Sequence, residues 1–191
     1  TDTGIEFARI EVNGQSEFGL FQLDIRNTEV QETNFGGGDD KAVITGDVLN
    51  AIELDLDGGD GVDTLDFSQA DTPVSVDLAT GTIEIENGPA QIVGGEAQIA
   101  QGPGQVASAI NFENIIGTNG SDVLKGNAQD NVLTGGSGND IMSGGEGSDT
   151  FVFREEDTGV KTILDFELGV DQIAFLTTNP DVTTENLLAN M

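Results

Sequence analysis

Apolar and polar positions recur with a period of nine residues between residues 117 and 152. Each of four successive units begins with glycine, has Asp or Asn at its sixth position and has an apolar residue at its eighth. The units begin at Gly117, Gly126, Gly135 and Gly144, and a separate fifth copy begins at Gly58. The Gly- and Asp-rich part of each unit favours a turn, and the last three residues favour a short strand with one inward apolar side chain. Two units therefore predict one 18-residue coil of a parallel β solenoid, in which neighbouring coils stack to bury those side chains.

The segments before the repeats also have the composition and punctuation of β strands. Two pairs of strands are predicted around Asn13-Gly14 and Ala79–Gly81 turns, with two single strands between them: Ile5–Val12, Phe18–Ile25, Ala42–Thr45, Ile52–Leu56, Val74–Leu78 and Thr82–Glu86. The Gly-, Gln- and Pro-rich stretch Gly88–Gly104 is predicted to be a mobile loop. Only Thr184–Met191 has a pattern that favours a helical turn, so we expect little helix.

Apolar residues after the repeats predict a β cap that closes the end of the solenoid. They lie in Phe151–Phe153, Thr162–Phe166 and Gln172–Phe175. An open end would expose a strand edge that promotes aggregation. The predicted fold is therefore all-β: a right-handed parallel β-roll or β-helix solenoid with irregular N-terminal strands and a C-terminal cap. We divide one continuous elongated domain into residues 1–56 (N-terminal β segment with early coils), 57–116 (separate repeat, strands and Gly-rich loop), 117–152 (repeats) and 153–191 (cap).

Composition and charge exclude several classes of protein. With 35 Asp and Glu against 6 Lys and Arg, the formal net charge is −29, which repels nucleic acid and anionic membranes and attracts cations. Cys and His are absent, which excludes disulfides, zinc–histidine sites and Ser-His-Asp triads. Because of this charge, we expect no nucleic-acid binding. No apolar run approaches the roughly 18 residues of a membrane-spanning helix, so we also expect no membrane insertion. High charge with low hydropathy is also typical of disordered chains, and that alternative stays open.

The repeated pattern Gly-Gly-x-Gly-x-Asp-x-apolar-x resembles the haemolysin-type calcium-binding repeat (RTX) family. Gly58–Asp66, Gly135–Ser143 and Gly144–Val152 match it in full, and Gly117–Lys125 departs from it only with Thr118 at the second position. Residues 74–118 and 162–171 resemble the segments that flank such repeats. The resemblance implies several bound Ca²⁺ ions and an extracellular or cell-surface location. It also implies export by type I secretion machinery, with a secretion signal within residues 153–191.

The resemblance further implies which residues hold the ions, because in this family a turn and the turn one coil later each supply half of the ligands. Ca²⁺ takes six to eight oxygen ligands at about 2.3–2.6 Å. The first ion is expected among Thr118, Gly120, Asp122, Gly135, Ser137 and Asp140, and the second among Asn127, Gln129, Asn131, Gly144, Glu146 and Asp149. We expect weaker affinity at the second, because Gln129 replaces glycine and Asn131 replaces aspartate.

Three further ions are predicted at the ends of the repeat block and in the separate copy. Their ligand sets are Gly136, Gly138 and Asp140 with Asp157; Gly145, Gly147 and Asp149 with Asp165; and Gly58, Asp60 and Asp63 with Gly36, Gly38 and Asp40. Asp140 and Asp149 would then each bridge two successive ions. Gly-Asp turns are common in proteins that bind no metal, but four contiguous units in phase favour calcium.

The predicted function is a calcium-binding module of a secreted protein that stays unfolded in a calcium-poor cytosol and folds on export. It would support type I secretion, stability or surface attachment. A structural or adhesive segment of a surface layer or adhesin remains an alternative that is compatible with calcium binding. A carbohydrate-active enzyme would use paired carboxylates such as Glu84 and Glu86, but an exposed acidic strand face explains them better in so acidic a chain. We therefore predict no enzyme activity, with any catalytic domain lying outside this chain.

Overall fold

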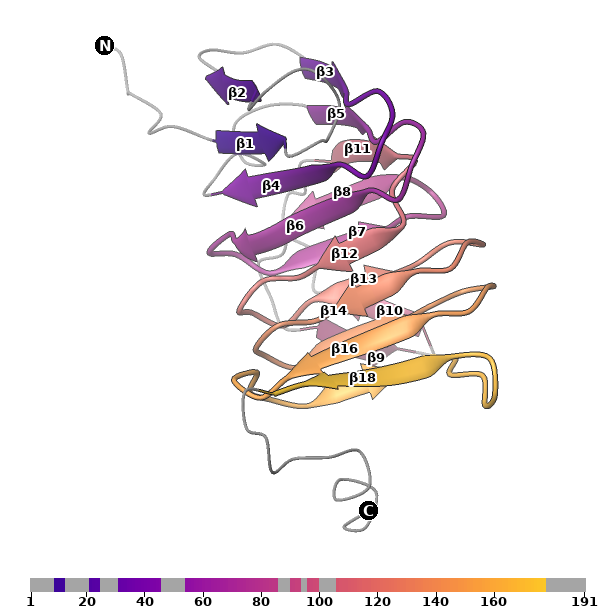
Figure 1. The fold of residues 1–191 in the computed structure, drawn as a ribbon. Coiled ribbons are helices and arrows are strands. Elements are labelled where there is room, and N and C mark those ends of the chain that lie inside the picture. The colour runs from indigo at the N-terminus through magenta and orange to yellow at the C-terminus, as the bar shows by residue number, and fades with distance from the viewer. Residues whose placement is uncertain are drawn as a thin grey trace, which may run out of the picture.

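The computed structural model describes residues 9–12, 21–24, 31–45, 54–85, 90–93, 96–99 and 106–177. Every regular element in these ranges is a β strand, which confirms the all-β prediction. Two eight-stranded sheets run along the length of the molecule, and a separate two-stranded hairpin lies beside them (Figure 1). The predicted helical turn Thr184–Met191 lies outside the described residues.

The two sheets have the same number of strands and run in the same direction along the stack. In spatial order, sheet 1 contains β18 (Gln172–Leu176), β16 (Thr150–Arg154), β14 (Val132–Thr134), β12 (Asn114–Ile116), β6 (Thr64–Gln69), β4 (Lys41–Thr45), β1 (Arg9–Val12) and β2 (Phe21–Asp24). Sheet 2 contains β17 (Lys161–Ile163), β15 (Asp140–Ser143), β13 (Val123–Lys125), β7 (Val74–Asp77), β8 (Thr82–Ile85), β11 (Val106–Ile110), β5 (Leu54–Asp57) and β3 (Gln31–Asn34).

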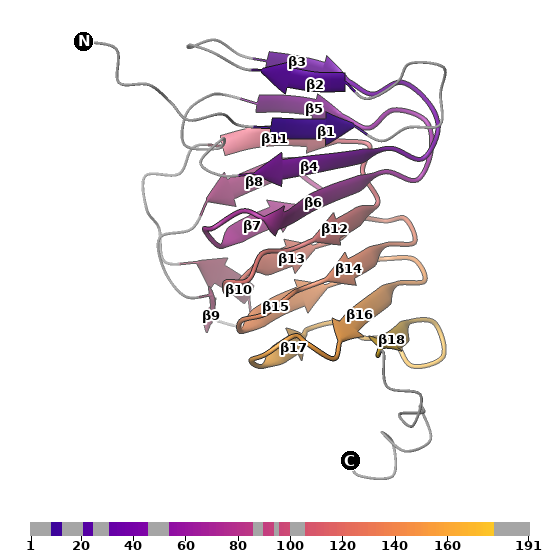
Figure 2. The same ribbon diagram turned by 60° about the vertical axis from the view of Figure 1, so that its left-hand side comes forward.

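From β12 onward the chain alternates between the sheets, so each strand pairs in parallel with the strand two places later. In sheet 1, Ile115 pairs with Leu133 and Leu133 with Phe151. In sheet 2, Leu124 pairs with Met142. Each pairing spans 18 residues, which is the offset that the nine-residue period predicts. Figures 1 and 2 show the resulting layers of strands, one coil above the next.

The apolar residues at the eighth position of the repeats form the core between the sheets. Their side chains are fully buried: Leu65, Leu124, Leu133, Met142 and Phe151. Burying one such side chain contributes about 1.5–3 kcal/mol. Strands of three or four residues cannot hold such side chains away from water alone, so the stability of each coil depends on its neighbours.

Two predicted hairpins are present, and they lie at the N-terminal part of the stack. β7 and β8 pair antiparallel, with Gly81 at φ 70° in the turn, and β8 inserts between β7 and β11 in sheet 2. β1 and β2 also pair antiparallel, although the expected Asn13-Gly14 turn lies outside the described residues. The predicted single strands before the repeats correspond to β4 and β5.

The prediction of a mobile loop over Gly88–Gly104 is wrong for part of that stretch. β9 (Ala90–Val93) and β10 (Glu96–Ile99) form an antiparallel hairpin beside β13 and β15. The sequence carries a signal for it, because alternating apolar residues flank a Gly94-Gly95 pair, a dipeptide that favours two-residue hairpin turns. The high Gly and Gln content of the surrounding residues obscured that alternation.

The chain after the repeats continues the two sheets for one more coil. β17 pairs with β15, and β18 pairs with β16. Several apolar side chains of the predicted cap are exposed rather than buried in this coil, including Phe166, Leu168, Ile173, Phe175 and Leu176. Phe175 stacks on Phe153 with ring centroids 5.5 Å apart.

Candidate functional site

The turns that join the two sheets stack in two columns, one on each side of the core. The first turn column leads from sheet 1 to sheet 2 and contains residues 70–73, 117–122, 135–140 and 155–160. The second turn column leads from sheet 2 to sheet 1 and contains residues 35–40, 58–63, 111–113, 126–131, 144–149 and 164–171. All the candidate ion ligands of the sequence lie in these columns.

Successive turns lie so close that glycine is required at their second and fourth positions. Gly136 and Gly138 have φ of 84° and 101°, and a Cβ atom on either would overlap the carbonyl oxygens of Thr118 and Gly120 in the preceding turn. Gly145 and Gly147 lie in the same way on Asn127 and Gln129. The preceding turns have no left-handed residue at these positions, and Thr118, Asn127 and Gln129 occupy three of them. A Cβ atom on Gly120, at the fourth, would lie 2.5 Å from Pro73 Cγ. The replacement of glycine by Gln129 therefore leaves its carbonyl oxygen in place.

The glycine at the first position of each repeat makes room for the carboxylate at the sixth. A Cβ atom on Gly144 would overlap Asp149 Oδ2, and one on Gly58 would lie 2.6 Å from Asp63 Oδ2. The missing Cβ atom therefore leaves room for the sixth side chain to lie inside the turn. Asp63, Asp122, Asp140 and Asp149 are consequently at most 1% exposed.

One oxygen of each inward carboxylate accepts a hydrogen bond from the main chain of the preceding coil. The donors are Asp40 N to Asp63 Oδ1 (2.7 Å), Asp122 N to Asp140 Oδ1 (3.0 Å) and Asn131 N to Asp149 Oδ1 (2.9 Å). The second oxygen of Asp40, Asp63 and Asp149 has no hydrogen-bond partner among the described residues, whereas Asp140 Oδ2 lies 3.1 Å from Lys161 Nζ. A buried acceptor left in this state costs about 1–3 kcal/mol, which a bound cation would offset.

Burial raises the pKa of these carboxyl groups, and neighbouring carboxylates raise it further. Burial raises the pKa of Asp63, with Glu113 and Asp40 adding to the shift. Burial also raises the pKa of Asp149, with Asp171, Asp165 and Asp130 adding to it. The pKa values of Asp40 and Asp140 shift in the same direction for the same first cause.

Asp122 has the best hydrogen-bonded carboxylate of the set. It accepts hydrogen bonds from Val74 N (2.8 Å), from Thr118 N (2.7 Å) and from Thr118 Oγ1. Burial still outweighs these donors and raises its pKa to about 7. Negative charge is therefore held in both columns at the expense of folded-state stability.

The structure brings together the residues predicted for the first two ions. Turn 117–122 lies against turn 135–140 through the Asp122–Asp140 contact, and turn 126–131 lies against turn 144–149 through the Asn131–Asp149 contact. Ser137 and Glu146 lie in these stacked turns, where Ser137 Oγ accepts a hydrogen bond from Thr158 N and Glu146 N donates one to Asn127 O.

The residues of the other three predicted sites have different environments. Asp165 accepts hydrogen bonds from Gly144 N and Gly145 N, both at 3.0 Å, and so lies on the turn of Asp149. Asp60 N donates to Gly36 O and Gly38 N donates to Asp60 O, so turns 35–40 and 58–63 are stacked. Asp157 instead accepts a hydrogen bond from Arg154 N at 3.0 Å, and Lys161 Nζ is the group that reaches Asp140.

Two acidic residues that the sequence analysis missed extend the second turn column. Glu113 Oε2 accepts a hydrogen bond from Asp63 N (2.8 Å), and Asp171 Oδ1 accepts one from Asp149 N (3.0 Å). Each directly precedes a strand, β12 or β18, as the sixth residue of a repeat does. An acidic residue at that position was the available signal.

Carboxylates alone do not assemble a metal site in the part of the chain that the structure describes. No group of three or more acidic side chains converges there on one point. Main-chain carbonyls must therefore supply most of the ligands, and the stacked turns present such oxygens at Thr118, Gly120, Asn127 and Gln129. A hard dication with six to eight oxygen ligands suits this mixed set.

Comparison with protein families agrees with this arrangement. Residues 116–151 match the model of the RTX calcium-binding nonapeptide repeat in four copies. The chain therefore carries a block of RTX repeats, and such repeats bind Ca²⁺, several ions per repeat region. No curated protein sequence matches the chain. Within the described ranges, no helix has the length and apolar character needed to cross a membrane.

Proposed function

We propose that the chain is a calcium-dependent folding module of a secreted protein, built as a parallel β-roll solenoid. The buried Oδ2 atoms of Asp40, Asp63 and Asp149 support this proposal most directly, because they lie between stacked turns and have no hydrogen-bond partner among the described residues. A net charge of −29 favours the uptake of divalent cations on folding.

The RTX block and the turns around it would hold the ions in pairs of stacked turns. The central ligands would be the carbonyls and carboxylates of Thr118, Gly120, Asp122, Gly135, Ser137 and Asp140, and of Asn127, Gln129, Asn131, Gly144, Glu146 and Asp149. A further site would join Gly145, Gly147 and Asp149 to Asp165, with Asp171 beside it. The fourth would use Gly36, Gly38, Asp40, Gly58, Asp60 and Asp63, outside the matched repeats.

The energetics favour a switch between unfolded and folded chain. A ligand at ten times its Kd stabilises the folded state by about 1.4 kcal/mol per site, so four sites give roughly 6 kcal/mol. Domains are stable by only about 5–15 kcal/mol in total. The module would therefore be unfolded where calcium is scarce and folded outside the cell.

A calcium titration followed by circular dichroism tests the proposal. In EGTA we expect a spectrum with little β structure, and in saturating CaCl₂ a full β spectrum, with several ions per chain by equilibrium dialysis and elemental analysis. A complete β spectrum in EGTA would contradict calcium-dependent folding, and a chain without bound calcium would contradict the function itself.

A matched pair of variants links the binding to the inward carboxylates. Asp149→Asn removes one negative ligand from a buried position, so we expect a higher calcium midpoint and fewer bound ions. Glu84→Gln removes the same charge from an exposed position of β8 and should leave both unchanged. Equal effects of the two variants would show that net charge, rather than the turn columns, governs binding.

Secretion by a type I system, and a role in stability or surface attachment, belong to the same proposal. Deleting residues 178–191 should abolish export from a host with a type I exporter while calcium binding by the purified chain persists. Unchanged export would place the signal elsewhere. The proposed segments 1–56, 57–116, 117–152 and 153–191 would form one elongated domain, since sheets 1 and 2 both pass from one segment to the next.

A further inference from the structure

One buried carboxylate differs from the others because a cation of the chain reaches it. Asp140 is fully buried, and its Oδ2 lies 3.1 Å from Lys161 Nζ. The Lys161 side chain is only 8% exposed, whereas Lys41 and Lys125, which pair with carboxylates elsewhere in the described ranges, are about 40% exposed. Among the described residues no ion pair reaches Asp40, Asp63 or Asp149.

The Lys161 ammonium group lies among oxygen atoms of two stacked turns. It donates hydrogen bonds to Gly138 O and to Thr158 O, both at 2.8 Å, in addition to its contact with Asp140. These three contacts use all three N–H donors of an ammonium group. Two main-chain carbonyls and an aspartate are also the kinds of ligand that the turn columns offer to calcium.

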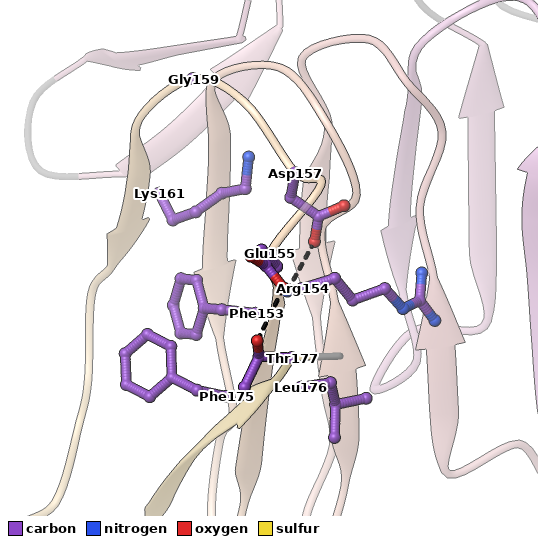
Figure 3. Close-up of a pocket in the computed structure, with 9 residues that line it drawn as sticks. All are labelled: Phe153, Arg154, Glu155, Asp157, Gly159, Lys161, Phe175, Leu176 and Thr177. Atoms are coloured by element: carbon purple, nitrogen blue, oxygen red, sulfur yellow. Dashed lines mark hydrogen bonds between the residues drawn. The ribbon is translucent and has the colours of Figure 1, made fainter. Parts of the chain in front are cut away.

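The structure fixes Lys161 in this position through both its backbone and its stem. β17 pairs Lys161 with Asp140, and Asp140 N donates to Val160 O at 3.0 Å. Figure 3 shows the stem passing beside the ring of Phe153, with Nζ directed away from Phe153 and Phe175. Phe153, Phe175 and the Lys161 stem line one pocket, while the charged end of Lys161 reaches the turns.

We propose that the Lys161 ammonium group occupies the cation position between turns 135–140 and 155–160, so that this level of the first turn column needs no calcium. The inference rests on the proposed calcium sites and replaces the expected ion between Asp140 and Asp157. A tethered ammonium group is satisfied by three oxygens and is present at any calcium concentration. Lys161 therefore ends the ion column, and the last level of the folded chain is paired without a calcium ion.

Replacing Lys161 by alanine opens the position and tests the inference. Lys161→Ala should bind one more Ca²⁺ per chain than the wild type. The slope of log(folded/unfolded) against log[Ca²⁺], measured at fixed urea, should rise by about one, because one more ion is taken up on folding. Lys161→Arg keeps the charge and should retain the wild-type count and slope.

Lys125→Ala is the matched control, since it removes an exposed lysine from β13 of the same sheet. Lys125→Ala should change neither the number of Ca²⁺ ions bound per chain nor the slope. If the wild type binds calcium while Lys161→Ala shows the wild-type count and slope, the inference is overturned and the proposed function stands. If the wild type binds no calcium, the proposed function itself fails.

A measurement on the unmodified chain covers the case in which Lys161→Ala does not fold even at saturating calcium. Brief acetylation of the folded protein, read by mass spectrometry, should modify Lys161 at least about tenfold more slowly than Lys125, because its amine is buried and fully bonded. Equal rates for the two lysines would overturn the inference.

Discussion

At the scale of single residues, each fixed position of the nonapeptide has a steric or electrostatic reason in this chain. The first glycine leaves room for the inward carboxylate, and the second and fourth glycines approach carbonyl oxygens of the preceding turn. The aspartate at the sixth position accepts a main-chain hydrogen bond from the coil before it, and at Asp63 and Asp149 the other carboxylate oxygen has no hydrogen-bond partner among the described residues. A substitution at any of these positions should therefore affect calcium binding and folding together.

Gly144→Ala is expected to destabilise the folded chain by at least about 2 kcal/mol in saturating calcium, because the new Cβ overlaps Asp149 Oδ2. Urea unfolding followed by circular dichroism measures the change. Gly37→Ala is the control: Gly37 has no positive φ, and its Cβ would meet nothing closer than Asp60 O at 3.6 Å. A stable Gly144→Ala protein with unchanged calcium affinity would contradict this account of the first position.

Asn131→Asp is expected to make folding more dependent on calcium rather than simply to restore a ligand. The Asn131 side-chain amide donates hydrogen bonds to Glu113 O (2.8 Å) and to Asn127 Oδ1 (3.2 Å), and a carboxylate would turn acceptors toward both. The calcium midpoint of folding should therefore rise, while the number of ions bound at saturation stays equal or rises. A lower midpoint would show that the lost amide donors matter little.

At the scale of elements, the strands of the repeats are too short to be stable alone and depend on stacking. β12, β13 and β14 have three residues each, and each contributes one central side chain to the core. Ile115, Leu133 and Phe151 form a continuous buried row across sheet 1. Truncating one side chain in the row should therefore destabilise the coils on both sides of it.

Leu133→Ala should cost about 2–5 kcal/mol, because it leaves a cavity in the middle of this row. Val132→Ala is the matched control in the same strand. Val132 is 40% exposed, so its replacement removes little from the core. The free energies of unfolding of both variants are compared in saturating calcium. Similar losses for the two variants would mean that the coils do not depend on the inward side chain.

At the scale of the whole molecule, the buried and mutually repelling carboxylates destabilise the folded chain when no cation is bound. Five inward aspartates have raised pKa values, and the chain as a whole carries a formal charge of −29. Calcium bound at the proposed sites would relieve this destabilisation. Protonation should relieve part of it in the same direction.

In EGTA, the folded fraction is therefore expected to rise as the pH is lowered from about 7.5 to 5. The pKa of Asp122 is about 7 in the folded chain and about 3.9 in an unfolded one, so the folded state binds more protons in this range. Stability from this group is present at low pH and is lost as the pH rises through about 7. Circular dichroism in EGTA across this range checks the sign, and a folded fraction that falls on acidification would contradict it.

One carboxylate, Asp66, has the opposite effect on the pH dependence of folding, but does not reverse it. Burial raises the pKa of Asp66, but its hydrogen bonds and ion pair with Lys41 and its hydrogen bonds with Ser68 outweigh burial and lower that pKa below the ordinary value. Asp66 therefore contributes stability that is present at higher pH and is lost on strong acidification. The five groups with raised pKa values outnumber it.

The sequence by itself determined the parts of this protein that repeat locally. The period of nine fixes the 18-residue register of β12 to β16, the inward side chains and the turns that carry the glycines and aspartates, because each unit makes the same contacts with the unit two places later. The class of metal also follows from the repeated oxygen donors. The pairing of turns 35–40 and 58–63, predicted from the spacing of their Gly and Asp residues, is also present in the structure.

Only the tertiary structure decided which groups meet where the spacing is irregular. Leu65 pairs with Ile115 and Val76 with Leu124, and the intervening chain includes an antiparallel strand and a hairpin that no period encodes. Glu113 and Asp171 reach the second turn column, and Lys161 reaches Asp140, through contacts set by that register. A local pattern specifies which face of a strand a side chain takes, but hydrogen-bond register between distant segments specifies its neighbour. That register is why Asp140 meets Lys161 while Asp63 and Asp149 meet no cation of the described residues.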